Sequence, residues 1–410
     1  MIVRILKPEE KYLSQMVQAV AFEGTFDLEQ AKAKCQEIPE KPAYTGVLPH
    51  DGRSPFTWAA LSDDERDIYG CMGITAYPVR FDGHTVLMGG VGGVSTLPQH
   101  RRHGAIRECM KAAFADMYEK GYVLTSLYPF SAAYYRKFGY EVGPDMLDWT
   151  IDMSALKLPD VGGRMELILP GQDLSDVLKV YNDCAADWNT AAVREVFDQD
   201  MANRNWTEQH RHLYLWRDDS GEPRGYILFR KENGVMDCLN KFGMPNGLMF
   251  RDARALTALL KFATLFAADY RAIRFTLPAN IRVQGLISEL NKVQVEGSYN
   301  GMHRFVNVQR ALELCRCRGE GDIRIGVTDP MLPQNDGTWR IRFAVGQPNI
   351  VEKTDETPDI ALPVGTLSQM LLGVRCADDL PMMPDVHIAN PDAPYAGIFY
   401  TKTCRMLELF

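Results

Sequence analysis

Four residues of a short basic turn have the chemistry to bind a phosphorylated cofactor: Arg101, Arg102, Gly104 and Arg107. The arginines supply positive charge, and Gly104, which has no Cβ, allows a phosphate to approach the backbone closely. No Gly-Lys-[Ser/Thr] sequence follows the turn, so it does not match a nucleotide-binding P-loop. The alternative interpretation of these residues alone is a basic surface turn before an ordinary helix.

The sequence on either side of the turn shows which elements would position it. Residues 86–96 are apolar, β-branched and glycine-rich, as in a strand, and Pro98 ends the run because its ring removes a backbone donor. From Ala105 to Tyr118, apolar residues recur at helical spacing. The turn therefore lies at the N-terminus of a helix, where unpaired N–H groups and the helix dipole attract an anion. This arrangement predicts a pyrophosphate-binding site.

The spacing Arg101-x-x-Gly104-x-Ile106 resembles the acetyl-CoA signature of the GNAT N-acetyltransferase superfamily, which is [Gln/Arg]-x-x-Gly-x-[Gly/Ala]. The bulky Ile106 departs from that signature. The longer pattern Val-x-Thr-x-Pro-x-x-Arg-Arg-x-Gly, from Val94 to Gly104, is similar to one branch of the superfamily, the Eis (enhanced intracellular survival) acetyltransferases. This resemblance implies acetyl-CoA as the co-substrate.

The resemblance also assigns contacts to the co-substrate. Backbone groups of Val94 and Thr96 would contact the thioester carbonyl and the pantetheine. Thr96 stands where the family has valine, which matters little for a main-chain contact. The implied diphosphate contacts are Arg101, Arg102, Gly104 and Ala105.

Acetyl transfer to an amine also needs an acid for the leaving thiolate and a base for the amine's proton. Residues 134–140, Tyr-Tyr-Arg-Lys-Phe-Gly-Tyr, resemble the family's Ile-Tyr-x-x-Phe-Gly-Tyr segment, whose catalytic tyrosine falls on Tyr135. A phenol, with a pKa of about 10, can be this acid if a nearby positive dipole offsets the uphill transfer. The family's base is the C-terminal carboxylate of its final Phe, and this chain ends in Phe410. From the residues alone, Tyr135 could be core packing and Phe410 a hydrophobic plug.

The acceptor is suggested by the resemblance. Eis proteins are similar to aminoglycoside N-acetyltransferases that modify several amines of one polycationic molecule, which implies an open, acidic cavity. Glu23, Asp27 and Glu408 are candidates for its walls, or they are solvated surface carboxylates. The expected acceptor is an aminoglycoside-like or polyamine molecule, or a lysine side chain. Family members commonly form hexamers, so we expect a homo-oligomer.

The composition limits the partners. The chain has 410 residues, 46% of them hydrophobic, and a net charge of −8, so no global field attracts nucleic acid or anionic lipid. No secretory signal and no run of about 18 apolar residues occurs, which predicts a cytoplasmic protein without a membrane partner. The nine cysteines are scattered, only Cys315 and Cys317 being close, and the eight histidines show no zinc-site spacing. We expect no metal.

The order of predicted elements indicates an α/β (α+β) multidomain chain, with two GNAT-type domains in tandem before a sterol-carrier-protein-like domain. Residues 1–150, which contain the acetyl-CoA site, begin with a strand and helices over 11–22 and 27–37, followed by a meander. A similar order recurs in residues 151–299, but there the phosphate turn lacks glycine and adds Asp252, so this degenerate copy should not bind CoA. Residues 300–410 form the sterol-carrier-like domain implied by the resemblance. Their apolar end should be buried and would supply the terminal carboxylate.

Two functions of other classes stay open. In a lipid-binding protein built on a GNAT scaffold, the third domain would carry the function, although the intact Arg101-x-x-Gly104 turn argues against this. In a nucleotide-binding oxidoreductase, the glycines of residues 89–93 would form a dinucleotide loop. They precede the strand end, however, instead of opening the helix.

Overall fold

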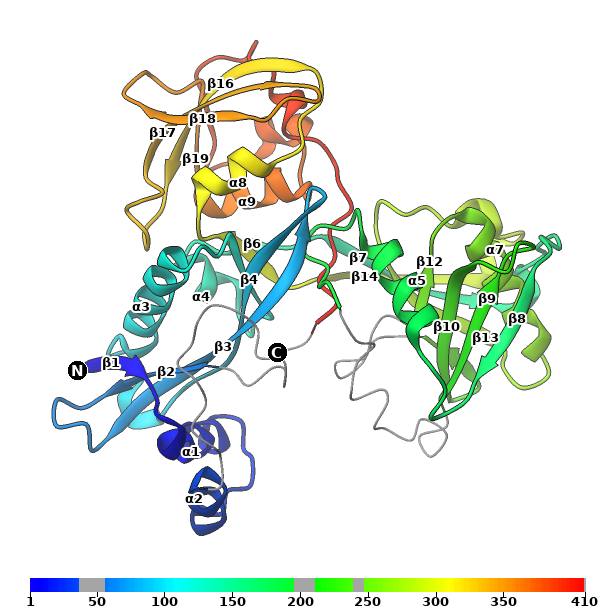
Figure 1. Ribbon diagram of the computed structural model, residues 1–410, viewed down its shortest axis with the longest axis horizontal. Coiled ribbons are helices and arrows are strands. Elements are labelled where there is room, and N and C mark those ends of the chain that lie inside the picture. The colour runs from blue at the N-terminus through cyan, green and yellow to red at the C-terminus, as the bar shows by residue number, and fades with distance from the viewer. Residues whose placement is uncertain (37–55, 195–210, 239–246, 409–410) are drawn as a thin grey trace.

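The computed structural model describes residues 1–36, 56–194, 211–238 and 247–408. Its strands form three sheets, each accompanied by helices, in three units that Figure 1 shows at the lower left, at the right and at the top. We number these units in the order in which their sheets begin along the chain. The mixed α/β multidomain class is confirmed.

The first unit is a seven-stranded sheet with helices packed on it. Its elements are β1 (Ile2–Ile5), α1 (Lys11–Ala21), α2 (Leu28–Gln36), β2 (Phe56–Leu61), β3 (Ile68–Phe81), β4 (His84–Thr96), α3 (Ala105–Glu119), β5 (Leu124–Leu127), α4 (Ala132–Arg136), β6 (Glu141–Val142) and, from far along the chain, β15 (Met302–Phe305). The strand order is β1-β2-β3-β4-β5-β15-β6. Neighbouring strands are antiparallel, except β4 and β5, which are parallel.

The helices of this unit follow the apolar spacing of the sequence. The predicted helices 11–22, 27–37 and 105–118 correspond to α1, α2 and α3, with residue 37 outside the described residues. Asp27 begins α2 as predicted, because its carboxylate accepts from the N–H of Gln30 at 2.9 Å. The predicted core residues of α3 are all buried and pack on β2, β3 and β4; they are Ile106, Met110, Ala113, Phe114 and Met117.

The second unit is an eight-stranded sheet. Its elements are β7 (Asp145–Asp152), β8 (Arg164–Ile168), α5 (Ser175–Ala185), β9 (Arg211–Arg217), β10 (Pro223–Glu232), β11 (Val235–Asp237), β12 (Leu248–Phe250), α7 (Ala253–Ala263), β13 (Ala272–Pro278) and β14 (Val293–Tyr299). The order is β14-β7-β13-β11-β10-β9-β8, with β12 paired to β10. Residues 218–222 connect β9 to β10, and α7 packs in one apolar cluster with this hairpin.

The third unit is a five-stranded sheet in the order β18-β17-β16-β19-β20. Its elements are α8 (Val308–Leu314), β16 (Glu320–Thr328), β17 (Gly337–Ala344), β18 (Ile350–Thr354), β19 (Ile360–Pro363), α9 (Val364–Leu372) and β20 (His387–Ile388). Every residue of α9 is buried, because it packs in one cluster with this sheet and with the β3–β4 hairpin (Figure 1).

Short 3-10 helices occur in all three units. They are η1 (Pro8–Glu10), η2 (Pro98–His100), η3 (Met153–Ala155), η4 (Thr264–Phe266), η5 (Gln284–Leu286), η6 (Leu290–Lys292), η7 (Ala377–Met382) and η8 (Tyr395–Gly397).

A buried ion pair joins the first unit to the third. Arg304 on β15 donates to the carboxylate of Asp329, and both side chains are fully buried. Arg304 also donates to the carbonyl oxygen of Phe138, just after α4, and Asn335 Nδ2 donates to Asp329 at 2.8 Å. Loss of either charge would leave the other unpaired in the core, which is strongly destabilising. The pair therefore fixes the turn after α4 against the third unit.

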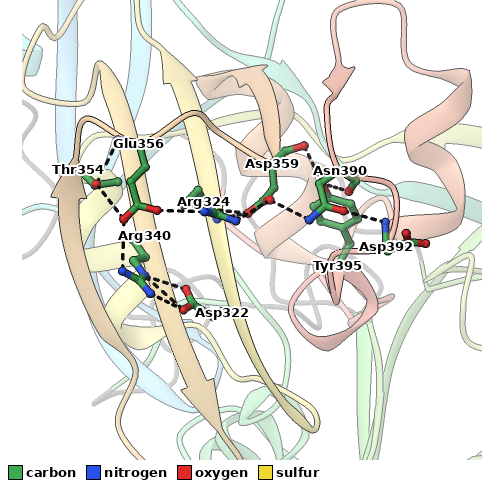
Figure 2. Close-up of polar contacts among 9 residues, drawn as sticks. All are labelled: Asp322, Arg324, Arg340, Thr354, Glu356, Asp359, Asn390, Asp392 and Tyr395. Carbon is green, nitrogen blue, oxygen red and sulfur yellow. Dashed lines mark hydrogen bonds and ion pairs between the residues drawn. The ribbon is translucent and has the colours of Figure 1, made fainter.

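A polar network on the third unit holds the start of the C-terminal tail, which we define as residues 395–408 (Figure 2). Arg324 Nε and Nη2 donate to the carboxylate of Asp359, each at 3.0 Å, and Asn390 Nδ2 donates to it at 2.9 Å. The Tyr395 hydroxyl donates to the carbonyl oxygens of Asp359 and Asn390. Burial alone would raise the pKa of Asp359, but the hydrogen bonds from Arg324 and Asn390 outweigh it and lower the pKa. The charged form of Asp359 thus stabilises the start of the tail.

Asp359→Asn is expected to lower the free energy of unfolding by about 1.5–3 kcal/mol, the usual contribution of hydrogen bonds to a charged group. The pKa of Asp359 is lower in the folded chain than in the unfolded chain. Its contribution is therefore complete above the unfolded pKa and is lost as the pH falls through the folded value. Urea unfolding in neutral and in acidic buffer should show a deficit at neutral pH that shrinks in acid.

Asp322→Asn is the matched control for this prediction. Asp322 pairs with Arg340 in the same network (Figure 2), but its side chain is 44% exposed, whereas that of Asp359 is 5% exposed. Exposed ion pairs contribute little to stability, so this variant should unfold at nearly the parental urea concentration. Equal losses in the two variants would show that burial of the Asp359 carboxylate does not matter.

Candidate active site

Strands β4 and β5 separate at the centre of the first sheet. Their parallel pairing ends at Val91 and Leu127, whereas β4 continues to Thr96 along β3. Val94 and Thr96 lie in this continuation and are half-buried. Because β5 no longer pairs there, one edge of β4 has backbone groups that the β5 ladder does not use. An extended chain such as pantetheine can pair with such an edge.

The basic turn follows β4 and ends where α3 begins, as the sequence predicts. Gly104 is the N-cap of α3, and its φ of 86° is a conformation that favours glycine. A Cβ at this position would meet nothing within 4 Å, so the backbone angle and not the space requires glycine. Arg101, Arg102 and Arg107 are exposed around it. Since Gly104 has no side chain that could cap α3, the first turn of this helix can bind an anion through its N–H groups.

The corresponding helix of the second unit is capped by a carboxylate. Asp252 accepts from the N–H of Ala255 at 2.8 Å and pairs with Arg224. Its negative charge thus occupies the N-terminus of α7, where a phosphate would have to bind. The N-terminus of α3 is therefore open to a diphosphate, whereas a carboxylate occupies the N-terminus of α7.

Tyr135 lies on α4 inside a cluster of aromatic side chains. Its ring centroid is 5.2 Å from that of Tyr134, 5.4 Å from that of Phe130 and 6.2 Å from that of Tyr140. The residue is 2% exposed and belongs to the same apolar cluster as the first two residues of α3. Burial raises the pKa of this phenol above its usual range, so the hydroxyl stays protonated at neutral pH. Tyr135 is therefore a buried, protonated phenol in the apolar cluster that also contains the start of α3.

Two contacts that sequence reasoning missed hold the segment around Tyr135. Gly139 has a φ of 79°, and a Cβ there would come within 2.9 Å of the Arg304 guanidinium, which explains the glycine of this segment. Tyr140 shares a 3.0 Å hydrogen bond with Thr125, whose hydroxyl donates to a β4 carbonyl oxygen at 2.6 Å. The two hydroxyl residues between the leucines of β5, Thr125 and Ser126, are the signal that could have indicated this contact. Arg304 has no such local signal, because its partners Phe138 and Asp329 are far from it in the sequence.

The C-terminal tail runs from the third unit to the region between the other two (Figure 1). Residues 398–400 and 404–408 are buried, as predicted for this apolar end. The N–H of Arg405 donates to the carbonyl oxygen of Asn189 at 2.9 Å, and the Asn300 side chain bonds both backbone groups of Met406. The tail is thus part of the core between the units.

Glu408, the last residue that the structure describes, is fixed from two sides. Its carboxylate accepts from Nε and Nη2 of Arg194, and both side chains are 4% exposed. Tyr128 donates its hydroxyl to the carbonyl oxygen of Glu408 at 3.0 Å. Because Tyr128 directly follows β5, this bond brings the tail to the end of the β4–β5 opening. Phe410, the predicted base, lies outside the described residues.

The three carboxylates predicted to line an acceptor cavity lie in two environments. Glu23 and Asp27 are exposed in the connection between α1 and α2, where Asp27 also caps α2. Glu408 is buried, and Arg194 compensates its charge. Glu23 and Asp27 can therefore bind a cation from solution directly. Glu408 could do so only if its ion pair with Arg194 were broken.

A cavity of about 1060 Å³ lies where the first unit meets the third. Tyr128 and Arg136 line it from the segment that carries Tyr135, and Glu141, Asp379 and Asp385 add carboxylates. Arg136 and Glu141 neutralise each other through a 2.7 Å ion pair. The volume is in the range of small-molecule sites.

Two features are not found among residues 1–36, 56–194, 211–238 and 247–408. No helix there is long and apolar enough to cross a membrane. No three His, Cys, Asp or Glu side chains of these residues lie close enough together to hold a metal ion.

Comparison with known proteins agrees with this geometry. Residues 17–143 match the family model of the acetyltransferase (GNAT) domain, and residues 308–396 match that of the sterol carrier protein domain. An uncharacterized N-acetyltransferase of Streptomyces avermitilis is 26% identical to the chain, over 77% of this chain and 81% of that protein.

Solved structures share the fold over the whole length. A probable N-acyltransferase of unknown function from Enterococcus faecalis superimposes with a TM-score of 0.81 at 21% identity, covering 100% of this chain and 99% of that one. A GCN5-related N-acetyltransferase from Anabaena variabilis gives a TM-score of 0.78 at 17% identity, with both chains covered to 100%. Eis1 from Mycobacterium abscessus gives a TM-score of 0.77 at 18% identity, also with both chains covered to 100%.

The chain is therefore an acyltransferase with a GNAT acetyltransferase domain, which implies acetyl-CoA as co-substrate. Its three-unit arrangement, with a sterol carrier protein domain in the third unit, is the fold that Eis1 from Mycobacterium abscessus also has. The predicted fold class is confirmed at this level. The two matched regions fall inside residues 1–150 and 300–410, and the boundaries at residues 150 and 299 stay predictions.

Proposed function

We propose that the chain transfers the acetyl group of acetyl-CoA directly to an amine of a polycationic small molecule, aminoglycoside-like or polyamine, or to a lysine side chain. The observation that carries this proposal is the glycine-capped N-terminus of α3 beside the opening between β4 and β5. Such a place offers main-chain donors to a diphosphate and a strand edge to an extended thiol arm.

Two sets of groups are proposed to bind acetyl-CoA. The backbone of Val94 and Thr96 would bind the pantetheine and polarise the thioester carbonyl, because β4 extends beyond its pairing with β5. The basic turn would bind the diphosphate through Arg101, Arg102, Gly104 and Ala105.

Tyr135 is proposed to protonate the leaving thiolate. Burial raises the pKa of its phenol, which keeps the proton in place until the thiolate forms beside it. Since a thiol has a pKa of about 8.5, proton transfer from the phenol to the thiolate is uphill. The positive end of the α3 dipole, in the same apolar cluster, would stabilise the phenolate that forms.

The α-carboxylate of Phe410 is proposed to take the proton of the amine. The support is the placement of the tail: Arg194 and Tyr128 hold Glu408 at the end of the β4–β5 opening. Two further residues reach about 7 Å at most, so the proposed base would stay near that opening. Arg194 would then act as a positioning residue, because it holds the tail and not the substrate.

Carboxylates are proposed to attract the positively charged acceptor. Glu23 and Asp27 are exposed and would contact additional ammonium groups of a polycation. Glu408 would contribute less to this attraction, because Arg194 compensates its charge. A polycationic acceptor is also favoured by the net charge of −8.

A screen of polyamines, aminoglycosides and lysine peptides with acetyl-CoA tests this proposal, with released free thiol as the readout. Turnover is expected with at least one polycationic amine. Thiol release with none of them, from a preparation that binds acetyl-CoA, would contradict the proposed acceptor class while leaving the co-substrate site intact.

Acetyl-CoA is expected to bind once per chain, because Gly104 leaves α3 open and Asp252 caps α7. Titration calorimetry should give a stoichiometry near one. Gly104→Glu should abolish binding, since it puts bulk and negative charge at the diphosphate position. A stoichiometry near two, or unchanged binding by the variant, would contradict this assignment.

Gly121→Glu provides the matched control for this titration. Gly121 follows the other end of α3, has a φ of 77°, and a Cβ there would also meet nothing within 4 Å. Both variants therefore force glutamate into the same kind of backbone conformation next to the same helix. Only Gly104→Glu should lose acetyl-CoA binding, which separates the anion site from general strain.

A lipid-binding protein on a GNAT scaffold is the second candidate, because residues 308–396 match the sterol carrier protein domain. A thermal-shift comparison of acetyl-CoA, NAD and a fatty acid distinguishes the candidates. Stabilisation by the fatty acid alone would favour lipid binding.

The resemblance also leads us to propose that the chain forms a homo-oligomer, namely a hexamer. Light scattering would measure the mass of this assembly.

A further inference from the structure

Two cysteines lie side by side where the third unit begins. Cys315 directly follows α8, Cys317 comes two residues later, and their Sγ atoms are 4.0 Å apart. All nine cysteines of the chain are free thiols. Cys315 is buried and Cys317 is half-buried, and Cys376 is the other cysteine that is not buried. The pair belongs to none of the groups assigned above to acetyl transfer.

The side chain of Asn349 holds the two thiols together. Its Nδ2 donates to the Cys315 carbonyl oxygen at 2.7 Å and lies 3.5 Å from the Cys315 Sγ. Its Oδ1 accepts from Cys317 Sγ at 3.4 Å. One amide thus contacts both sulfur atoms and keeps them 4.0 Å apart; a disulfide, with an S–S distance of about 2.05 Å, requires them to move together.

The surroundings of the pair shift the pKa values of its two thiols in opposite directions. The hydrogen bond with Cys315 lowers the pKa of Cys317, and the ammonium group of Lys402 acts in the same direction against burial. The hydrogen bond to Cys317 and burial raise the pKa of Cys315. Cys317 is therefore the better nucleophile, and Cys315 is placed to resolve a bond formed on it.

Cys317 can be reached from solvent. Both cysteines line a cavity of about 630 Å³ at the surface, together with Asp82, His84, Arg310 and Arg316. Glu313 also lines the cavity and pairs with Arg310 at 2.9 Å. Arg316, whose side chain is 54% exposed, is therefore the basic group that favours a reagent with a carboxylate. A small organic disulfide with such groups, like glutathione disulfide, has both the charge and the reactive bond that this cavity suits.

We propose that Cys315 and Cys317 form a thiol–disulfide exchange site for low-molecular-weight disulfides. The Cys317 thiolate attacks one sulfur of the reagent, the reagent's S–S bond breaks, and the released thiolate takes a proton from solvent. The Cys315 thiol then loses its proton to solvent and attacks the Cys317 sulfur, which releases the second reagent thiol. In sum, two protein thiols become one disulfide and one reagent disulfide becomes two thiols.

The site is linked to the C-terminal tail through Lys402. The Lys402 ammonium pairs with Asp82 at 2.6 Å, and these side chains are 7% and 4% exposed. Asp82 lies at the tip of the β3–β4 hairpin and also accepts from the N–H of Arg316, between the two cysteines. Lys402 favours the charged form of Cys317. Oxidation, which removes that thiol, would therefore act on a contact that joins the hairpin, the tail and the third unit.

The test treats the full chain with glutathione disulfide at neutral pH, followed by alkylation and peptide mapping by mass spectrometry. The expected product is a 315–317 peptide that is lighter by two hydrogens, with Cys376 still alkylated. Without the oxidant, Cys317 should be alkylated about tenfold faster than Cys376, because Cys315 and Lys402 favour the Cys317 thiolate. Lasting glutathione on Cys317 of the parent chain, or equal reactivity of Cys317 and Cys376, would overturn the proposal.

Two variants assign the steps. Cys315→Ser should retain glutathione on Cys317, because no second thiol can displace it. Cys376→Ser, the matched control, should form the 315–317 disulfide at the parental rate. A disulfide that needs Cys376, or a glutathione adduct that leaves Cys317 of Cys315→Ser as fast as in the parent, would also overturn the proposal. The parent measurement decides the question even if Cys315→Ser folds poorly.

Discussion

Conversion of the Phe410 α-carboxylate into a primary amide is expected to lower kcat/KM by about 1,000-fold, within the usual range for a positioned acid or base. A free terminal carboxyl has a pKa of about 3.5 and is a weak base, but burial raises the pKa of a carboxyl group. The tail that leads to Phe410 is buried from residue 404 to residue 408. The amide removes charge and basicity and changes little else, so acetyl-CoA affinity should be unchanged.

The amidated enzyme can be made by ligating a synthetic C-terminal peptide, and the same ligation with a free carboxylate is the control. A C-terminal purification tag should also abolish activity, because it replaces the carboxylate with an amide and adds bulk, whereas an N-terminal tag should not. Full kcat/KM in the folded, amidated enzyme would show that the base lies elsewhere and that Phe410 is a hydrophobic plug.

Tyr135→Phe is expected to lower kcat by about 100-fold or more, because it removes the phenolic proton and little else. Its ring is held by aromatic contacts at 5.2–6.4 Å that phenylalanine can keep. Folding and acetyl-CoA binding should therefore be normal. Since burial raises the pKa of Tyr135, the acid stays protonated in alkaline buffer, and kcat should not fall there on its account.

Tyr134→Phe is the control for this variant. Tyr134 is the adjacent residue on α4, and its ring centroid is 5.2 Å from that of Tyr135, so the two substitutions disturb the same cluster. Single-turnover rates should show the loss in Tyr135→Phe and near-parental chemistry in Tyr134→Phe. The reverse result would move the acid to Tyr134, and an unchanged rate in both would make these tyrosines core packing.

The parts of the fold that could be predicted from sequence are those with local signals at both ends. For α3, Gly104 marks the start and apolar residues at helical spacing mark one buried face, and the helix spans Ala105–Glu119. α9, which spans Val364–Leu372, has no such signal. Every face of α9 is buried, so no alternation of polar and apolar residues shows its extent. The edge strand β14 was missed because most of its residues are exposed.

The candidate active site also has parts that could be predicted from sequence and parts that could not. The turn at Gly104 and the segment around Tyr135 could be predicted, because each is a continuous stretch with characteristic residues. Their supports could not be predicted, because they depend on contacts between distant residues. Arg304 is 166 residues from Phe138, and Arg194 is 214 residues from Glu408. Only the packed units bring such partners together.

The place of β15 between β5 and β6 sets the order in which the chain can fold during synthesis on the ribosome. Both neighbours pair with β15, so neither is joined to the other until Met302–Phe305 has emerged. The strands of the second unit, from β7 to β14, are all made before it. Throughout that interval the nascent first sheet has an open edge at β5, and such edges invite pairing with other chains. A fragment that stops at residue 150 would keep this open edge permanently, so dissection of the enzyme by sequence order would yield an aggregating piece.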